Sequence, residues 1–198
     1  MNGRVLLVSL SLVALPAGAR AQHAGAAAPS PSTVAPREAS QFDFLIGQWQ
    51  LEVRPAVSGL AARIHGVPKL IGTWKAWRAF DGFGIEDELR ISDESGNPRT
   101  LSHALRVYDA TDRRWSTSML DVYRTTFTSS TAEWAQNQMT STSRGTDKDS
   151  KVFLSRSRFS DITSTSFRYV QERSTDDGRT WSETLRIQAK RTAPTATR

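Results

Sequence analysis

Hydrophobic and polar residues alternate with a period of two along most of the chain beyond residue 42. Trp49, Leu51 and Val53 share one face of the first such segment, and polar residues fall between them. Successive side chains of a β-strand point to opposite faces, so this alternation predicts strands with one buried face. The other strand candidates are 85–91, 101–107, 115–121, 131–143, 151–160, 164–174 and 180–190.

Turn signals separate these segments at the spacing of hairpins. They are Asp81-Gly82, Ser95-Gly96-Asn97-Pro98, Asp109-Ala110-Thr111-Asp112, Arg144-Gly145 and Asp176-Asp177-Gly178. The pattern predicts about eight to ten strands in a meander, and a sheet of that length normally closes because closure removes its exposed edges. We therefore expect residues 42–191 to form an all-β fold, a single antiparallel up-and-down β-barrel. A two-sheet sandwich is the alternative.

Two local motifs stand at the ends of this domain. Phe42-Asp43-Phe44-Leu45-Ile46-Gly47-Gln48-Trp49 combines apolar residues with a glycine, and it predicts a short helical plug that closes one end of the barrel. Ser174-Thr175-Asp176-Asp177-Gly178-Arg179-Thr180-Trp181 matches the Asp-box pattern of Ser-x-Asp-x-Gly-x-Thr-Trp. A single copy predicts a structural hairpin, in which the aspartate accepts hydrogen bonds from the turn.

The N-terminal segment has the features of an export signal. Arg4 precedes an apolar run, and Ala19-Arg20-Ala21 fits a cleavage site, so residues 1–21 are predicted to be a signal peptide. We expect a disordered linker at 22–41 and a disordered tail at 192–198. The protein is then periplasmic or extracellular, without a transmembrane segment, because the apolar run is shorter than the roughly 20 residues that a spanning helix needs.

Composition narrows the chemistry. The chain has no cysteine, which excludes disulfides, thiol catalysis and thiolate metal sites. The net charge of +6 falls to +4 when Arg4 and Arg20 leave with the signal peptide, and the remaining charges are dispersed. Dispersed charges are typical of a solvated surface, and with export they argue against a nucleic-acid partner. No metal-ligand spacing, nucleophile elbow or phosphate loop is present, so we expect no cofactor.

Polar residues on apolar faces are the candidate site, because a buried polar group needs a partner. Alternation places Asp87 beside Ile85 and Leu89, and Asp121 on the face of Trp115. It also places His103 with Leu101 and Leu105. The remaining candidates for ligand binding are Arg156, Arg158 and Tyr169. For Arg156 and Arg158 the alternative is that they face solvent and leave Phe153 and Phe159 inside.

The chain resembles domain-of-unknown-function family 1579 over residues 42–191. The resemblance rests on the opening motif Phe42–Trp49, on Gly82-x-Gly84, on Tyr108-Asp109 and on the hairpin from Glu172 to Gly178. It implies a lipocalin-like (calycin-like) barrel, often exported from bacteria and with no agreed activity. Haem-binding nitrobindins begin similarly, but their axial histidine lies near the C-terminal end, and this chain has none after His103.

Three functions fit these observations. The first is binding of a small apolar or amphipathic ligand inside the barrel. The second is an enzyme that uses His103 with Asp87 or Asp121 for proton transfer. The third is a structural or interaction module of the cell envelope, whose interior is filled by large side chains. The sequence leaves the ligand and the oligomeric state open.

Overall fold

The computed structural model describes residues 33–57 and 66–192. Three short 3₁₀ helices lie at η1 (Arg37–Ser40), η2 (Asp43–Leu45) and η3 (Phe80–Gly82). The strands are β1 (Gly47–Pro55), β2 (Leu70–Ala79), β3 (Gly84–Asp93), β4 (Pro98–Asp109), β5 (Arg114–Asp121), β6 (Thr126–Ala135), β7 (Gln138–Thr146), β8 (Val152–Ser160), β9 (Ser166–Ser174) and β10 (Ser182–Arg191).

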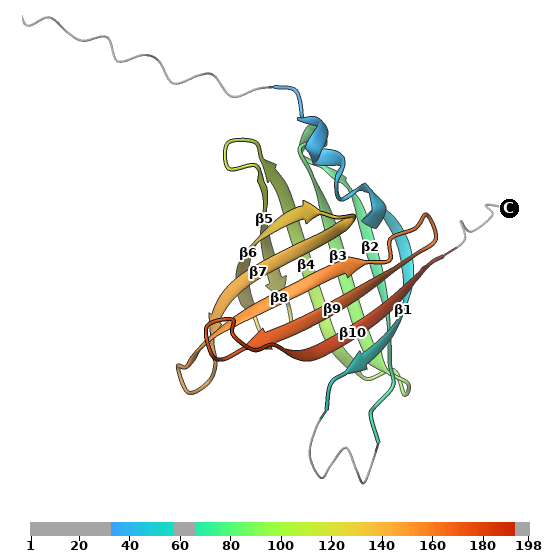
Figure 1. Ribbon diagram of the computed structural model, residues 1–198. Coiled ribbons are helices and arrows are strands. Elements are labelled where there is room, and N and C mark those ends of the chain that lie inside the picture. Colours follow the sequence, from blue (N-terminus) through green and yellow to red (C-terminus); the bar gives the residue numbers. More distant parts are fainter. Residues whose placement is uncertain (1–32, 58–65, 193–198) are drawn as a thin grey trace, which may run out of the picture. The chain divides into compact units, whose positions relative to one another are not determined.

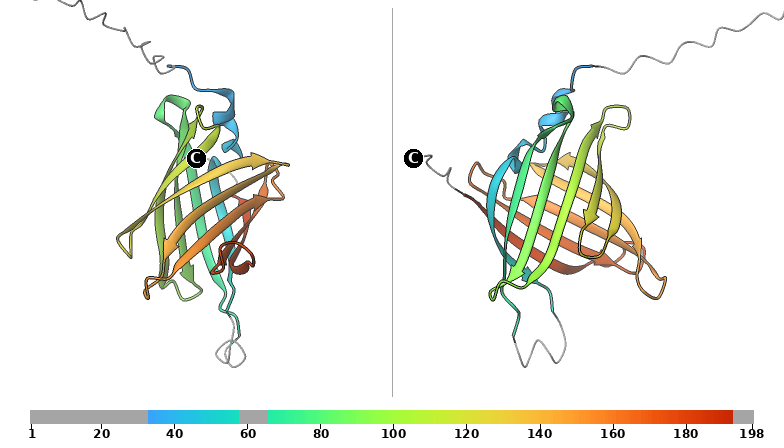
Figure 2. Two further views of the ribbon diagram at one scale, coloured as in Figure 1. Left: turned by 60° about the vertical axis from the view of Figure 1, so that its left-hand side comes forward. Right: turned by 180° about the vertical axis from the view of Figure 1, so that it is seen from behind.

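The ten strands form a closed antiparallel barrel in which each strand pairs with its neighbours in the chain (Figures 1 and 2). The ring closes where β1 pairs with β10, with Trp49 opposite Arg191 and Val53 opposite Ile187. This arrangement confirms the predicted single up-and-down barrel and excludes the sandwich. On β1 the alternation is as expected, because Trp49, Leu51 and Val53 are all buried.

Two strands were misjudged from the sequence. β2 was not predicted, because Trp74 faces inward and Trp77 outward, so that its two faces do not differ in polarity. The candidate strand 131–143 is a hairpin of β6 and β7, which turns at Gln136 and Asn137. Both turn residues have positive φ, as a two-residue hairpin requires.

One turn was also misplaced. Arg144 and Gly145 lie inside β7 and not in a turn; the chain turns after them, where the Asp147 carboxylate accepts hydrogen bonds from the Asp149 and Lys151 amides.

An aromatic plug closes one end of the barrel, which we call the plugged end. Phe42 and Leu45, beside and within η2, are completely buried. The Phe42 ring meets Trp115 edge-on, with 4.7 Å between ring centroids, and Phe159 at 6.0 Å. The Trp49 indole N–H donates to the Leu45 carbonyl at 2.7 Å, which ties the plug to β1. The predicted plug is therefore present, and Trp115, Phe159 and Trp49 pack against it.

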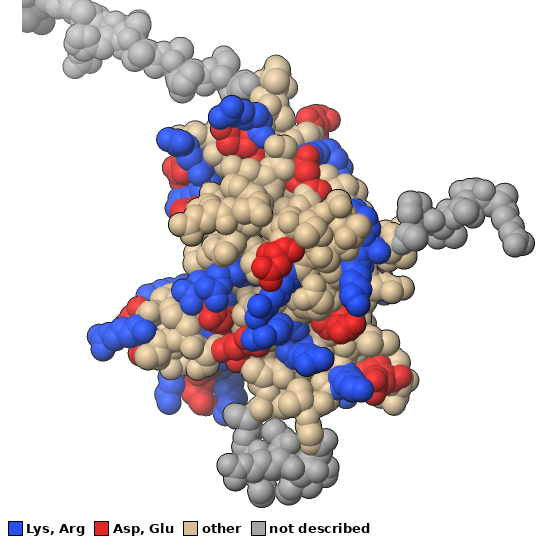
Figure 3. Space-filling model, turned by 45° about the vertical axis from the view of Figure 1, so that its right-hand side comes forward, with Lys and Arg blue, Asp and Glu red and all other residues tan. Residues whose placement is uncertain are grey.

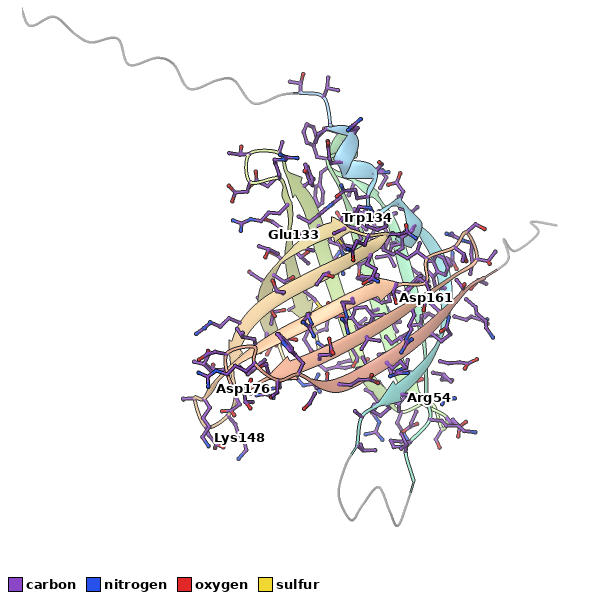
Figure 4. The ribbon with its side chains drawn as sticks, viewed as in Figure 1. Arg54, Glu133, Trp134, Lys148, Asp161 and Asp176 are labelled. Atoms are coloured by element: carbon purple, nitrogen blue, oxygen red, sulfur yellow. The ribbon has the colours of Figure 1, made fainter. Side chains whose placement is uncertain are left out.

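The hairpin between β9 and β10 lies at the opposite end. Figure 4 labels Asp176 there, beside Lys148 of the β7–β8 turn, and Trp134 near the plugged end. The Asp176 carboxylate accepts hydrogen bonds from the Thr180 hydroxyl at 2.6 Å and the Thr180 amide at 2.9 Å. These bonds, followed by that from Ser174, lower the pKa of Asp176 to about 2. The Asp-box motif thus forms a hairpin, as predicted.

The predicted signal peptide and almost all of the C-terminal tail lie outside the described residues. The first part of the predicted linker lies outside them as well, whereas η1 forms at its end. Within residues 33–57 and 66–192, no helix has the length and apolar character needed to cross a membrane.

Candidate functional site

A buried ion pair lies in the barrel interior beneath the plug. Asp87 of β3 is 2% exposed and Arg106 of β4 is 7% exposed. The Arg106 Nε donates to Asp87 Oδ2 at 2.5 Å and its Nη2 to Oδ1 at 3.3 Å. The Trp74 indole N–H also donates to Oδ1, at 2.8 Å. Two opposite charges buried together neutralise each other, so the interior carries polar groups but no net charge from this pair.

The register of the sheet explains how these groups meet. Asp87 is opposite Ala104 on β4, and Arg106 lies two residues further along the same inward face. Asp87 is opposite Ala76 on β2, and Trp74 lies two residues from Ala76. Diagonal neighbours of this kind are within reach of long side chains. The Arg106 guanidinium also lies over the Phe42 ring at 5.1 Å, which places the pair directly under the plug.

A cavity of about 100 Å³ adjoins this ion pair. Its lining includes aromatic and apolar side chains, those of Trp74, Leu89, Met119, Phe159 and Tyr169. It also includes hydroxyl groups, those of Ser102, Thr117, Thr128, Ser130, Ser141, Ser143, Ser155 and Ser157. Gln171 completes the lining together with the ion pair. Apolar and hydrogen-bonding groups together make the cavity amphipathic.

Two groups in this wall have unusual environments. The Thr117 hydroxyl oxygen is buried, in a residue that is 6% exposed, and it has no hydrogen-bond partner among the residues that the structure describes. A buried hydroxyl without a partner costs about 1–3 kcal/mol, so a molecule in the cavity that hydrogen-bonds with this group is favoured by a similar amount. Burial raises the pKa of Tyr169 above its ordinary value of 10.0, and a hydrogen bond with Ser157 partly offsets the effect. The Tyr169 phenol is therefore a neutral hydrogen-bonding group at physiological pH.

The structure brings Asp87 and Tyr169 of the predicted site residues to this cavity. The prediction that His103 faces the interior is wrong. Its side chain is 37% exposed and lies 3.3 Å from the Glu86 carboxylate. Its ring is tilted by 55° against that of Trp77 on the outside of the barrel. Because Asp87 faces inward and His103 outward, the predicted histidine–carboxylate pair for proton transfer is not assembled.

Asp121 is on β5, a strand that contributes to the cavity, but it is not one of the residues that line the cavity. It is at the end of β5, where its carboxylate accepts hydrogen bonds from the Arg124 amide at 3.1 Å and from the Arg124 guanidinium at 2.6 Å. Asp121 therefore stabilises the turn that follows β5 and does not line the cavity.

Arg156 and Arg158 face outward, which is the second of the two alternatives for β8. Both form ion pairs with the Glu172 carboxylate at 3.0 Å, and the Arg156 guanidinium lies 4.1 Å from the Trp181 ring centre. Phe159 is inside, as that alternative required. The face shown in Figure 3 likewise has basic side chains beside acidic ones. These arginines form a surface network and do not reach the cavity.

Sequence reasoning did not identify Arg106, Trp74 or the serine and threonine residues as lining of the interior site. Alternation alone places Arg106 outside, because its neighbours on the same face of β4 are Ser102 and Ala104, whereas Leu101 and Leu105 on the other face are apolar and yet face solvent. One signal was available: serine recurs with a period of two at Ser141 and Ser143 and again at Ser155 and Ser157. Small hydroxyl residues on a single face of neighbouring strands indicate a polar interior.

Comparisons with known proteins leave the barrel unassigned. No family and no curated protein matches the chain. One matching solved structure is described as EF1p2_mFAP2b bound to DFHBI; it is 10% identical, covers 78% of this chain and 98% of its own, and has a TM-score of 0.39. Another is an S-type phycobiliprotein lyase from Guillardia theta, which is 9% identical, covers 78% of this chain and 92% of its own, and has a TM-score of 0.42.

Proposed function

We propose that the protein binds a small, uncharged, amphipathic molecule in the barrel interior. The observation that carries this proposal is the unpartnered Thr117 hydroxyl in the wall of an amphipathic cavity. A ligand atom that accepts or donates a hydrogen bond there satisfies the group, while Trp74 and Phe159 contact the apolar part of the ligand. The cavity itself counts against the alternative of a barrel filled throughout by large side chains.

Size and charge define the class of ligand. A dry cavity of about 150 Å³ holds benzene, so the cavity of about 100 Å³ encloses a somewhat smaller molecule or the end of a larger one. The Arg106 guanidinium already donates two hydrogen bonds to the Asp87 carboxylate. An anionic ligand would have to displace that carboxylate, which favours a neutral ligand.

Pyrazole is a suitable first probe, because it is a small neutral ring with one hydrogen-bond donor and one acceptor. A five-atom ligand gains at most about 1.5 kcal/mol per atom, so affinities between micromolar and millimolar are expected. Titration followed by NMR should give saturable shifts confined to cavity residues. The absence of saturable binding up to about 10 mM would count against the proposal for this ligand class.

Thr117→Val separates a functional hydroxyl from a structural one. Valine has the shape of threonine without the hydroxyl, so the variant should gain about 1 kcal/mol in the free energy of unfolding and bind pyrazole more weakly. Thr73→Val on the exposed face of β2 is the matched control and should leave pyrazole binding unchanged. A Thr117→Val variant with unchanged affinity would exclude this hydroxyl from the site.

The proposal also places the protein outside the cytoplasm and among relatives of family 1579, on the strength of the sequence features given above. Export is tested by expressing the full chain with its own N-terminus and sequencing the N-terminus of the product in the cell envelope and the medium. Cleavage before Gln22 supports export, and an intact N-terminus in the cytoplasm contradicts it.

A further inference from the structure

The barrel wall parts between β6 and β7. Their pairing runs from Ala135 opposite Gln138 to Thr131 opposite Thr142 and goes no further, although both strands continue. The remaining residues of β6 pair only with β5, and Ser143–Thr146 pair only with β8. In Figure 2 the β5–β6 and β7–β8 hairpins end apart from each other. We call this gap between residues 126–130 and 143–146 the seam.

The pairing ends where most of the residues that would meet across the two strands are small. The continued register would place Ser130 opposite Ser143, and Phe127 and Arg144 are the only large side chains in these two stretches. Cross-strand side-chain pairs are the main stabilising unit of a sheet, so small partners add little to the pairing. Where the pairing ends, the Ser141 hydroxyl donates a hydrogen bond to the Ser130 hydroxyl at 3.0 Å.

The seam lies between the interior cavity and a hollow on the outer surface. A hollow of about 440 Å³ lies over it, and every residue that lines this hollow is serine or threonine except Arg144. Thr117, Ser130 and Ser143 line both this outer hollow and the interior cavity. By contrast, Phe42 and Leu45 at the plugged end are completely buried.

We infer that the seam is the entrance to the interior site, a lateral portal that admits small uncharged molecules able to hydrogen-bond with hydroxyl groups. This inference rests on the proposed function, because it supplies the route to the same cavity. Hydroxyl groups both donate and accept hydrogen bonds, so they replace the hydration of a neutral polar molecule along the whole path. They do not replace the hydration of an ion, whose transfer out of water costs far more.

Cysteine labelling tests the portal without any ligand, so its outcome is independent of whether pyrazole binds. The natural chain has no cysteine, and Thr117 and Ser102 are matched because both are 6% exposed and line the cavity. Of these two residues, only Thr117 also lines the hollow over the seam. Ser102 lies nearer the end opposite the plug, since Thr117 is opposite Arg106, four residues further along β4. Entry through the seam therefore predicts faster labelling of Thr117→Cys, and entry through that end predicts faster labelling of Ser102→Cys.

Iodoacetamide, a small neutral reagent, should label Thr117→Cys on the order of tenfold faster than Ser102→Cys, because local opening at the seam is easier than opening of a paired wall. Equal rates, or faster labelling of Ser102→Cys, would overturn the inference. Ser130→Cys is a second seam position if Thr117→Cys fails to fold, with folding checked by circular dichroism.

The charge preference is read from the same variants. Iodoacetate, the anionic analogue, is compared with iodoacetamide after each rate is divided by the rate at Thr73→Cys, an exposed position on the outer face of β2, away from the seam. We expect a lower normalised rate for iodoacetate at Thr117→Cys. Equal normalised rates for the two reagents would contradict the assignment of the portal to uncharged molecules.

Discussion

Replacing Asp87 with alanine tests whether the buried ion pair supports the barrel. The change leaves the Arg106 guanidinium, 7% exposed, without its carboxylate and leaves the Trp74 N–H without its acceptor. Loss of one partner from a buried ion pair costs about 3–5 kcal/mol, and an unpaired buried N–H costs about 1 kcal/mol more. We therefore expect the free energy of unfolding, measured by urea denaturation, to fall by about 4–6 kcal/mol.

A double variant separates the unpaired charge from lost packing. Asp87→Leu with Arg106→Met removes both charges and keeps apolar volume, and such replacements of buried pairs are often neutral. Its loss of stability should be smaller than that of Asp87→Ala by about 2 kcal/mol or more. Arg186→Gln breaks an exposed pair with Glu183 and should cost at most about 1 kcal/mol. The reasoning would be refuted if Asp87→Ala lowered the free energy of unfolding by no more than Arg186→Gln does.

Further predictions concern the plug, two titrations and the outer face. Phe42→Ala should cost about 3–5 kcal/mol in urea denaturation, because it empties the centre of the plug; a cost below about 1 kcal/mol would contradict this role. Because burial raises the pKa of Tyr169 above 10.0, the folded state disfavours its ionised form, and stability should fall as pH rises above 10. Tyr169→Phe should make that alkaline loss shallower, and an unchanged slope would argue against the assignment. The pKa of Asp176 is lowered from 3.8 to about 2, so the ionised carboxylate contributes its full stabilisation of the folded state above pH 3.8 and loses it as the pH falls through 2. Asp176→Asn should therefore make the dependence of the melting temperature on pH shallower between pH 4 and 2. An equally steep dependence in the variant would contradict this. His103→Ala should leave pyrazole affinity unchanged, since the imidazole lies outside the barrel.

Much of the architecture could be predicted because alternation reports local burial. Strands such as β1 and β3 carry apolar residues on one face, and each strand signals its presence independently of its partners. The opening motif and the Asp-box hairpin could also be predicted, because their hydrogen bonds join residues that are close together in the chain. β2 escaped detection, since tryptophan occurs on both of its faces.

The candidate site was predicted only in part. Asp87 and Tyr169 have apolar neighbours on their own faces, so the rule that the apolar face is buried places them correctly. The same rule fails on β4, where Leu105 is 40% exposed and Arg106 is buried. The sequence of β4 contains no information about Asp87, which is the reason that Arg106 can be inside.

By itself, then, the sequence determined an antiparallel meander with a plug motif, a cysteine-free chain and some polar residues inside. The tertiary structure decided which face of β4 is interior, where the β6–β7 pairing ends and which hydroxyl groups share a cavity. These features depend on the register between strands, and the free energy of burying a polar group depends on the partner across the strand. A buried arginine is stable at position 106 because β3 presents a carboxylate beside it, a relation that no local pattern in either strand contains.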